Sequence, residues 1–221
     1  MTTSRATMRT TVHLMRHGEV HNPLGVLYGR IAGYNLSELG HEMAAKVAGS
    51  LKDADITYLV ASPLERAQQT ARPLADILKL DIHTDERVIE AGNKFEGKSF
   101  GAGAGALTRP SNWWLLRNPI RPSWGEPYKE IAARMRLAID DAREAARGHE
   151  AVIVSHQLPV WTARRSYENA RFAHDPRNRQ CSLASLTTLS FEDDRFVGLT
   201  YSEPAGDLIP RTLRKKFVGG A

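Results

Sequence analysis

The sequence of 221 residues contains a single cysteine, Cys181, so no disulfide can form within the chain. It has no apolar run approaching the roughly 20 residues that a membrane-spanning helix requires. The first ten residues, MTTSRATMRT, are polar and lack the apolar stretch of a secretory signal. These absences favour a cytoplasmic protein without a membrane partner, because the cytoplasm keeps thiols reduced.

Lysine is scarce, with 8 lysines against 22 arginines, and the formal net charge is +5. Arginine binds phosphates and carboxylates in a bidentate manner, so an anionic ligand is one explanation. The other is arginine-rich codon use with solvated side chains on helix faces, which we favour for Arg134, Arg136, Arg143 and Arg147. The basic residues are scattered and form no nucleic-acid-binding motif, so we expect no nucleic-acid partner.

Segments typical of strands alternate with segments typical of helices. The strand-like segments are short and rich in Val, Ile, Leu and Tyr, and they lie at 11–15, 57–61 and 151–155. The helical segments lie at 37–53, 62–80 and 126–148. The alternation predicts an α/β fold with a mostly parallel central sheet and helices on both faces. Near the C-terminus, LASLTTLSF and RFVGLTY flank EDD and predict a hairpin that adds an antiparallel element.

The start of the second helical segment carries a helix-capping pattern. Ser62 suits the N-cap, Pro63 the first helical position, and Glu65 completes a capping box. We therefore predict that the helix begins at residue 62.

Residues 91–125 interrupt the alternation, because they are rich in Gly, Pro and Trp and show little periodicity. We interpret them as a lid-like insertion over the active-site edge of the sheet, within a single domain that spans 1–221. Trp113, Trp114 and Trp124 lie in this insertion. Stacking on a substrate ring is one role for them, and packing of the insertion onto the domain is the more common one.

Ionisable side chains follow three of the expected strands. Arg16 and His17 follow the first strand, Arg66 lies shortly after the second, and His156 follows the third. In a parallel α/β sheet the carboxyl ends of the strands meet at the ligand-binding edge, so these side chains should converge there. Two arginines and two histidines would repel one another unless an anion completes the site. A phosphoryl group is the natural anion, since it accepts bidentate bonds from arginine.

Four segments in order resemble the sequence motifs of the histidine phosphatase superfamily, which includes the cofactor-dependent phosphoglycerate mutases. These segments are LMRHGEV, SPLERAQQTA, RVIEAGNKFEG and VSHQLPV, and they span residues 12 to about 160. The resemblance implies a phosphoglycerate mutase-like fold. It also implies that His17 is a nucleophile that forms a phosphohistidine, with Arg16, Arg66 and His156 around the equatorial oxygens of phosphorus.

The resemblance implies further roles near the reacting phosphorus. Glu90 would protonate the leaving oxygen and later deprotonate the attacking water. Glu19 and Glu96 are rival carboxylates, of which Glu19 would position the loop and Glu96 would have a structural role. Asn22 would donate one more hydrogen bond to the phosphoryl group.

The sequence departs from the family pattern at two places. Gln157 follows His156 where the family often has glycine, so its side chain would narrow the pocket and contact substrate. The loop before the first helix matches only loosely, and within it Arg30 and Tyr28 would either contact substrate or order the loop. His21 is interpreted as an exposed loop histidine.

A metal site is the first alternative, because His17 and His21 are four residues apart. Ligation at that spacing requires a helix, whereas this stretch follows a strand, so we expect neither a metal nor another cofactor. A binding module on an inactive fold is disfavoured, because all the expected phosphate-binding residues are present. Among enzymes, we expect a phosphatase that acts on a small phosphomonoester. A cofactor-dependent mutase and a phosphoprotein phosphatase remain alternatives, and the sequence is compatible with a homodimer.

Overall fold

The computed structural model describes residues 7–98 and 125–210, which form a sheet of six strands in the order β3-β2-β4-β1-β5-β6. The strands are β1 (Arg9–Arg16), β2 (Ile56–Ala61), β3 (Ile82–Thr84), β4 (Glu150–Ser155), β5 (Leu186–Glu192) and β6 (Arg195–Ser202). The first four pair in parallel, while β5 pairs antiparallel with both β1 and β6. The predicted mostly parallel sheet with a C-terminal hairpin is confirmed.

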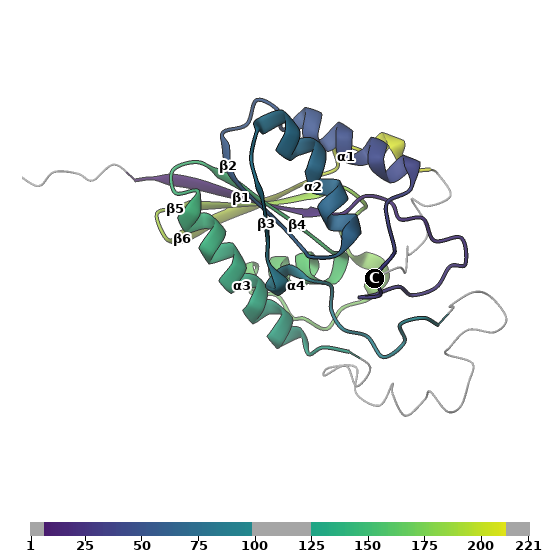
Figure 1. Cartoon of the computed structure of the whole chain (residues 1–221). Helices are drawn as coiled ribbons and strands as arrows, with labels where there is room; N and C mark the ends of the chain where they lie inside the picture. Colours follow the sequence, from purple (N-terminus) through teal and green to yellow (C-terminus); the bar gives the residue numbers. More distant parts are fainter. Residues whose placement is uncertain (1–6, 99–124, 211–221) are drawn as a thin grey trace, which may run out of the picture.

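Helices cover both faces of this sheet, as predicted (Figure 1). They are α1 (Glu38–Ser50), α2 (Glu65–Leu78), α3 (Tyr128–Ala145) and α4 (Gln157–Tyr167). Short 3-10 helices η1 (Glu86–Val88), η4 (Pro176–Asn178) and η5 (Gly206–Leu208) lie in the connections. Among the described residues, no helix combines the length and apolar character needed to cross a bilayer.

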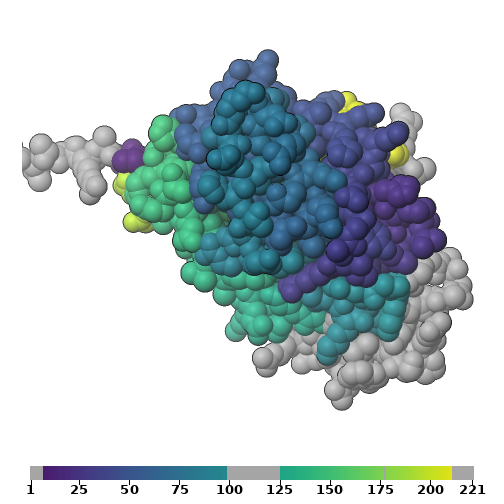
Figure 2. Space-filling view, in the orientation of Figure 1, coloured from purple at the N-terminus to yellow at the C-terminus, as the bar shows by residue number. Residues whose placement is uncertain are grey.

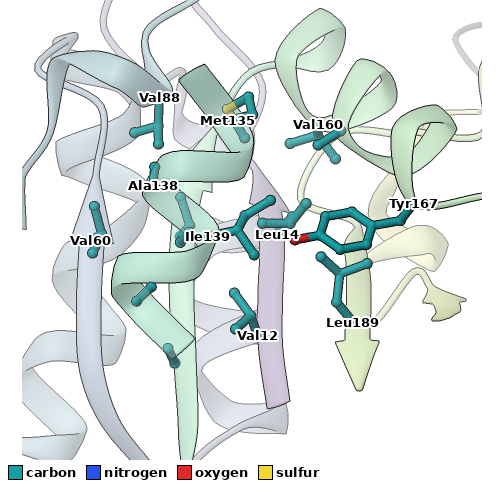
Figure 3. Packing of buried hydrophobic residues seen from close by; sticks show 14 of the residues in the cluster. Val12, Leu14, Val60, Val88, Met135, Ala138, Ile139, Val160, Tyr167 and Leu189 are labelled. Atoms are coloured by element: carbon teal, nitrogen blue, oxygen red, sulfur yellow. The ribbon is translucent and has the colours of Figure 1, made fainter. Parts of the chain in front are cut away.

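The core has two halves because successive residues of a strand point to opposite faces of the sheet. On β1, Leu14 packs with α3 and α4, whereas its neighbour Met15 packs with α1 and α2. Figure 3 shows Ile139 of α3 beside Leu14 of β1. This packing holds the carboxyl ends of the strands in fixed positions.

The start of α2 differs from the prediction. The helix begins at Glu65, and its N-cap Leu64 makes no side-chain capping bond, so the predicted capping box is wrong. Glu65 instead accepts a hydrogen bond from the backbone N–H of Gly33 at 3.0 Å. Ser62 is used at the sheet edge, 2.8 Å from His156. Long-range partners therefore override the local capping pattern.

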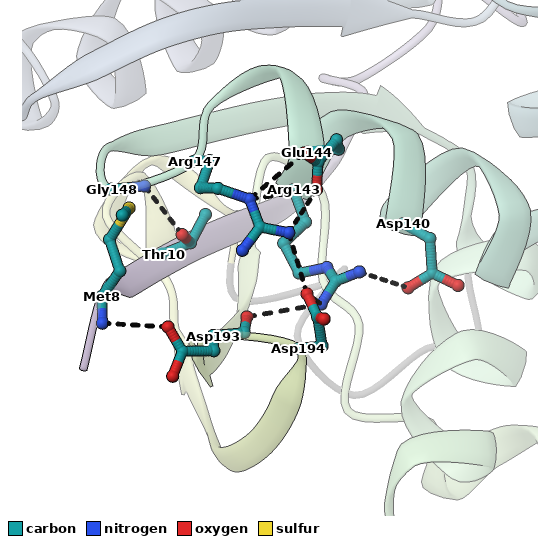
Figure 4. Close-up of polar contacts among 9 residues, drawn as sticks. All are labelled: Met8, Thr10, Asp140, Arg143, Glu144, Arg147, Gly148, Asp193 and Asp194. Carbon is teal, nitrogen blue, oxygen red and sulfur yellow. Dashed lines mark hydrogen bonds and ion pairs between the residues drawn. The ribbon is translucent and has the colours of Figure 1, made fainter. Parts of the chain in front are cut away.

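Two of the arginines that we assigned to a solvated helix face tie α3 to the β5–β6 turn (Figure 4). Arg143 Nη1 lies 2.8 Å and Arg147 Nη2 lies 2.9 Å from Asp194 Oδ1. Arg147 also pairs with Glu144. This network lies beside the beginning of β1, at the opposite end of the sheet from Arg16.

The predicted insertion at 91–125 lies mostly outside the described residues. Its two ends meet, because Asn93 and Gly125 form an antiparallel bridge. Near the surface, the segment that ends at Lys98 lies beside the early loop around Leu27 (Figure 2), whose backbone N–H donates to Lys98 O at 3.0 Å. Trp113, Trp114 and Trp124 are not among the described residues, so the lid-like role stays a prediction.

Candidate active site

Three adjacent strands, β2, β4 and β1, end at the same edge of the sheet. The residue that follows each strand is Ser62, His156 and His17, respectively, and all three are 0% exposed. The ring centroids of His17 and His156 lie 5.1 Å apart. The predicted convergence of the two histidines is therefore present.

One ring nitrogen of His17 is hydrogen-bonded to the backbone, and the other has no partner among the described residues. Its Nδ1 lies 2.7 Å from the carbonyl oxygen of Gly18. A carbonyl can only accept, so Nδ1 carries the proton and Nε2 presents a lone pair. Nε2 is buried without a partner among the described residues. Burial, together with Arg66 and Arg16, holds the pKa of His17 well below its usual value, which keeps the ring neutral and nucleophilic.

The turn that carries His17 packs closely against the start of α1. The turn is also bonded to α2, where the Gly18 backbone N–H donates to Thr70 Oγ1 at 3.0 Å. A Cβ atom on Gly18 would lie 2.6 Å from the carbonyl oxygen of Gly40, and one on Gly40 would lie 2.0 Å from that of Glu19. Only glycine allows this approach, so the geometry of the turn depends on Gly18 and on Gly40 of α1.

Arg16 and Arg66 are buried, at 2% and 0% exposure, and neither forms an ion pair with a carboxylate of the described residues. Arg16 Nη1 donates to Cys181 O at 2.8 Å, and Arg66 Nη2 donates to Gly29 O at 2.6 Å. Two further nitrogens of each guanidinium are buried and unpartnered among the described residues. Burial lowers the pKa of Arg66. Two such buried cations are stabilised by an anion that accepts from both.

Tyr28 forms a wall beside this pair, with its ring centroid 4.7 Å from the guanidinium carbon of Arg66 and 6.5 Å from the ring of His17. It stacks on Tyr34 at 5.0 Å. Burial raises the pKa of Tyr28, so its hydroxyl stays protonated. The position is compatible with both roles that the sequence left open for it.

The orientation of His156 is set by Ser62. His156 Nε2 lies 2.8 Å from Ser62 Oγ, and Ser62 Oγ also accepts from the backbone N–H of Leu64 at 3.4 Å. When Ser62 donates its hydroxyl proton to Nε2, the proton of neutral His156 sits on Nδ1, which is buried and unpartnered among the described residues. Burial, followed by Arg66 and His17, lowers the pKa of His156. Nδ1 is then a hydrogen-bond donor available to a ligand.

Glu90 is 0% exposed and has one carboxylate oxygen engaged. Oε1 accepts from the backbone N–H of Ala91 at 2.7 Å, whereas Oε2 is unpartnered among the described residues. Burial raises the pKa of Glu90, although Ala91 N–H and the nearby arginines act in the opposite direction. The carboxyl group is thereby suited to donate a proton and take one back.

The rival carboxylates are engaged in loop contacts. Glu19 accepts from the hydroxyl of Ser37, which caps α1. Glu96 accepts from the backbone N–H of Arg30 at 3.1 Å and of Asn93 at 3.2 Å. Both contacts agree with the positioning and structural roles expected for these two residues.

Asn22 and Arg30 have partners within the protein. Asn22 Nδ2 donates to Val26 O at 2.8 Å, and its Oδ1 accepts from Val26 N at 3.2 Å, so the side chain closes a loop. Arg30 Nε donates to the carbonyl oxygen of Glu90 at 2.6 Å, and its Nη2 pairs with Glu126 at 2.9 Å. Arg30 thus supports the backbone of Glu90. Contacts of Asn22 and Arg30 with substrate stay predictions.

The sequence reasoning missed Arg179. Its Nη1 lies 3.3 Å from Gln157 Oε1, and its field acts on Glu90 and Arg16. Arg179 lies in RFAHDPRNRQ, a loop between α4 and β5 that matches none of the family motifs. The surplus of arginine in that loop was the available signal.

No group of three His, Cys, Asp or Glu side chains in the described parts of the chain is arranged to hold a metal ion. The unpartnered atoms of the site are instead mostly hydrogen-bond donors on arginine and histidine. Such donors suit an oxyanion.

The unpartnered ring nitrogen of His17 lies at the same edge of the sheet as the buried guanidinium groups of Arg16 and Arg66, an arrangement suited to binding a phosphoryl group. The sequence profile described as histidine phosphatase superfamily (branch 1) matches residues 12–204. The chain belongs to this superfamily.

The chain is also similar to other proteins and, in its fold, to solved structures. The chain is 55% identical over 196 residues to the uncharacterized protein Rv0525 of Mycobacterium tuberculosis, covering 89% of this chain and 97% of the relative. It is 28% identical over 206 residues to the probable phosphoglycerate mutase GpmB of Yersinia pestis, with coverages of 89% and 92%. The fold is similar to that of a phosphoserine phosphatase from Entamoeba histolytica, with a TM-score of 0.71, 22% identity and coverages of 90% and 100%.

Proposed function

We propose that this protein is a metal-independent phosphomonoesterase that hydrolyses a small phosphorylated metabolite through a phosphohistidine intermediate. The observation that carries the proposal is the bare Nε2 of His17, whose proton is fixed on Nδ1 by the Gly18 carbonyl. A neutral imidazole with that tautomer is ready to attack phosphorus without first losing a proton.

In the first step, Nε2 of His17 forms a bond to phosphorus while the ester P–O bond breaks. Glu90 gives its proton to the leaving oxygen, so the alcohol departs neutral and Glu90 becomes a carboxylate. The free nitrogens of Arg16 and Arg66 and Nδ1–H of His156 bind the equatorial oxygens, where negative charge gathers in the transition state.

In the second step, a water molecule attacks phosphorus opposite the P–N bond. Glu90 takes a proton from this water, the P–N bond breaks, and His17 returns to its neutral form. Inorganic phosphate leaves the site. Glu90 therefore alternates between acid and base, which its buried position and free Oε2 support.

A phosphoglycerate mutase is the second candidate, favoured by the similarity to GpmB. A mutase must exclude water from the phosphohistidine and return the phosphoryl group to a second hydroxyl. Arg66 and Glu90 are joined only by α2, β3 and η1, which leaves no additional segment on that side of the site. This short connection favours hydrolysis over transfer.

The test is incubation of the purified chain with p-nitrophenyl phosphate and a metabolite panel in the presence of a chelator. We expect release of inorganic phosphate and rapid labelling of His17 by radioactive phosphoester. The His17→Ala variant should lose both, whereas the control His21→Ala in the exposed loop should keep both. Metal-dependent turnover, unchanged activity of His17→Ala, or isomerisation of phosphoglycerate with negligible hydrolysis would overturn the proposal.

A further inference from the structure

Arg179 reaches the site from outside the family motifs, through a segment that also supports Arg16. The carbonyl oxygen of Cys181, two residues after Arg179, accepts from Arg16 Nη1 at 2.8 Å. The same oxygen lies 3.5 Å from Nε2 of Gln157. The loop between α4 and β5 is thus anchored at the phosphoryl site, and Arg179 is carried with it.

Two neutral side chains hold the guanidinium of Arg179. Its Nε donates to Nε2 of His174 at 2.9 Å, and its Nη1 donates to Oε1 of Gln157 at 3.3 Å. His174 can accept because its Nδ1 donates to the Phe172 carbonyl oxygen at 2.5 Å, and burial lowers the pKa of this histidine. The side chain is therefore oriented, and its charge is not neutralised.

Other half-buried arginines of the chain show what is unusual here. Arg134, Arg143 and Arg164 have side chains 16%, 13% and 15% exposed, and each pairs with a carboxylate. Arg165 pairs with no carboxylate of the described residues, but it donates to the Arg171 carbonyl and lies over Trp161. Among the described residues, no carboxylate lies within ion-pair distance of Arg179, and its Nη2 makes no hydrogen bond.

Arg179 shares this condition with the phosphate-binding arginines. Burial lowers the pKa of Arg179, as it does for Arg66. An oriented, partly buried and uncompensated guanidinium is a binding site for an oxyanion.

The surroundings of Arg179 indicate which anion it meets. Arg16, Arg66 and His156 together present five unpartnered nitrogens, enough for the three equatorial oxygens of a phosphoryl group. Arg179 instead lies where it acts on Glu90 and Tyr128. Glu90 is the group that faces the leaving oxygen in the proposed reaction, so this side of the site receives the alcohol.

We propose that Arg179, held by Gln157 and His174, binds a second anionic group on the leaving alcohol of the substrate. The substrate class is thus a phosphomonoester whose alcohol also carries a carboxylate or a second phosphate. This inference rests on the proposed function, which defines the side of the site that holds the leaving alcohol. It adds that this alcohol is negatively charged. Gln157 is then a positioning residue for Arg179.

The test measures equilibrium binding by calorimetry in the His17→Ala background, which cannot turn substrate over. Glycerol 3-phosphate is compared with 3-phosphoglycerate, and fructose 6-phosphate with fructose 1,6-bisphosphate. We expect the more anionic member of at least one pair to bind about tenfold tighter or more, as befits a charge-assisted contact. The pair that shows the preference identifies the anion as carboxylate or phosphate.

Arg179→Gln in the same background should abolish that preference and leave the affinity for the less anionic member unchanged. Arg171→Gln, an exposed arginine of the same loop, is the matched control and should keep the preference. Equal affinities within both pairs, or an equal loss for both members in Arg179→Gln, would overturn the inference.

The wild-type chain separates this inference from the proposed function. Hydrolysis of p-nitrophenyl phosphate through labelled His17, without any preference for anionic alcohols, refutes only the role of Arg179. A charge preference in binding without hydrolysis refutes only the phosphatase. Arg179→Lys, which keeps the charge but loses the planar fork, should retain part of the preference and guards against misfolding of the glutamine variant.

Discussion

The rings of His17 and His156 lie 5.1 Å apart and are held in complementary ways. His17 uses Nδ1 to contact a backbone carbonyl and leaves Nε2 free as a lone pair. His156 uses Nε2 to contact Ser62 and leaves Nδ1 free. With Ser62 donating to Nε2, His156 presents an N–H while His17 presents a lone pair, and this pairing suits the attack on phosphorus in the proposed reaction.

Replacing Glu90 should slow hydrolysis most for substrates whose leaving oxygen must be protonated. We expect Glu90→Gln to lower kcat/KM for alkyl phosphates by about 100-fold or more, and to affect p-nitrophenyl phosphate far less, since nitrophenolate departs unprotonated. Because burial raises the pKa of Glu90, wild-type kcat/KM for alkyl phosphates should fall as pH rises through that pKa. In Glu90→Gln, kcat/KM for alkyl phosphates should no longer fall as pH rises through this range.

The control for that experiment is Glu96→Gln, which alters the rival carboxylate that supports Arg30 and Asn93. Any loss in this variant should be the same for both classes of leaving group. Equal losses for both classes in Glu90→Gln would remove Glu90 from the role of acid.

Acid should destabilise the fold through the two buried histidines. Burial, followed by Arg66, holds the pKa of His17 and of His156 well below the usual 6.5. Below pH 6.5 the unfolded chain binds protons that the folded chain does not, so the free energy of unfolding falls as pH falls. The limiting slope is about 1.4 kcal/mol per pH unit for each histidine, and it ends at the folded pKa.

Denaturant unfolding between pH 7 and 5, without phosphate, measures that slope. We expect His17→Gln to reduce it by about 1.4 kcal/mol per pH unit and the exposed control His41→Gln to leave it unchanged. The comparison between variants matters because Glu90, whose pKa is raised by burial, contributes a slope of opposite sign below its folded pKa. Identical slopes in wild type and His17→Gln would contradict the assigned cause.

Ser62 should act on the reaction only through His156. Ser62→Ala removes the hydroxyl 2.8 Å from His156 Nε2, so the ring loses its preference for a proton on Nδ1. We expect kcat to fall about tenfold, the scale of one lost hydrogen bond in the transition state, with Ser62→Thr restoring most of it. Nitrogen NMR of His156 should show a mixture of tautomers in Ser62→Ala, and an unchanged spectrum would refute the role.

The close approach of α1 to the nucleophile turn predicts opposite effects for two glycines in one helix. A Cβ on Gly40 would lie 2.0 Å from the carbonyl oxygen of Glu19, whereas one on Gly49 would meet nothing within 4 Å. Gly40→Ala should lower the melting temperature and the activity together. Gly49→Ala should raise stability by about 0.5 kcal/mol, because alanine is the better helix former. A neutral Gly40→Ala would show that the turn can shift.

The sequence contained enough information for the sheet and for the convergence of the strand-end side chains. Arg16, His17 and His156 lie at or just after strand ends, Arg66 lies in the first turn of the helix that follows β2, and strand ends are predictable from local apolar patterns. Glu90 could be identified only by resemblance, because it follows the 3-10 helix η1 rather than a strand that the pattern predicted.

The remaining contacts depend on tertiary structure that local patterns do not encode. Ser62 and Glu65 form a capping pattern, yet His156 and Gly33 are their partners in the fold. Arg179 is 163 positions from Arg16 in the numbering, and the two segments meet because Arg16 donates to the carbonyl oxygen of Cys181, two residues after Arg179. No spacing rule predicts such a meeting, since both arginines arrive on segments joined through the antiparallel strand β5.

The site residues come from two kinds of structural element, strand ends and a loop. His17, His156 and Ser62 are joined directly to the last residues of three hydrogen-bonded strands, so they move only if the sheet moves. Arg179 lies in the loop between α4 and β5, and loops tolerate changes in length or sequence without a change in strand pairing. Under the proposed role of Arg179, substitutions at residues 171–180 that leave the backbone of Cys181 in place would change which alcohol is bound without moving the residues at the strand ends.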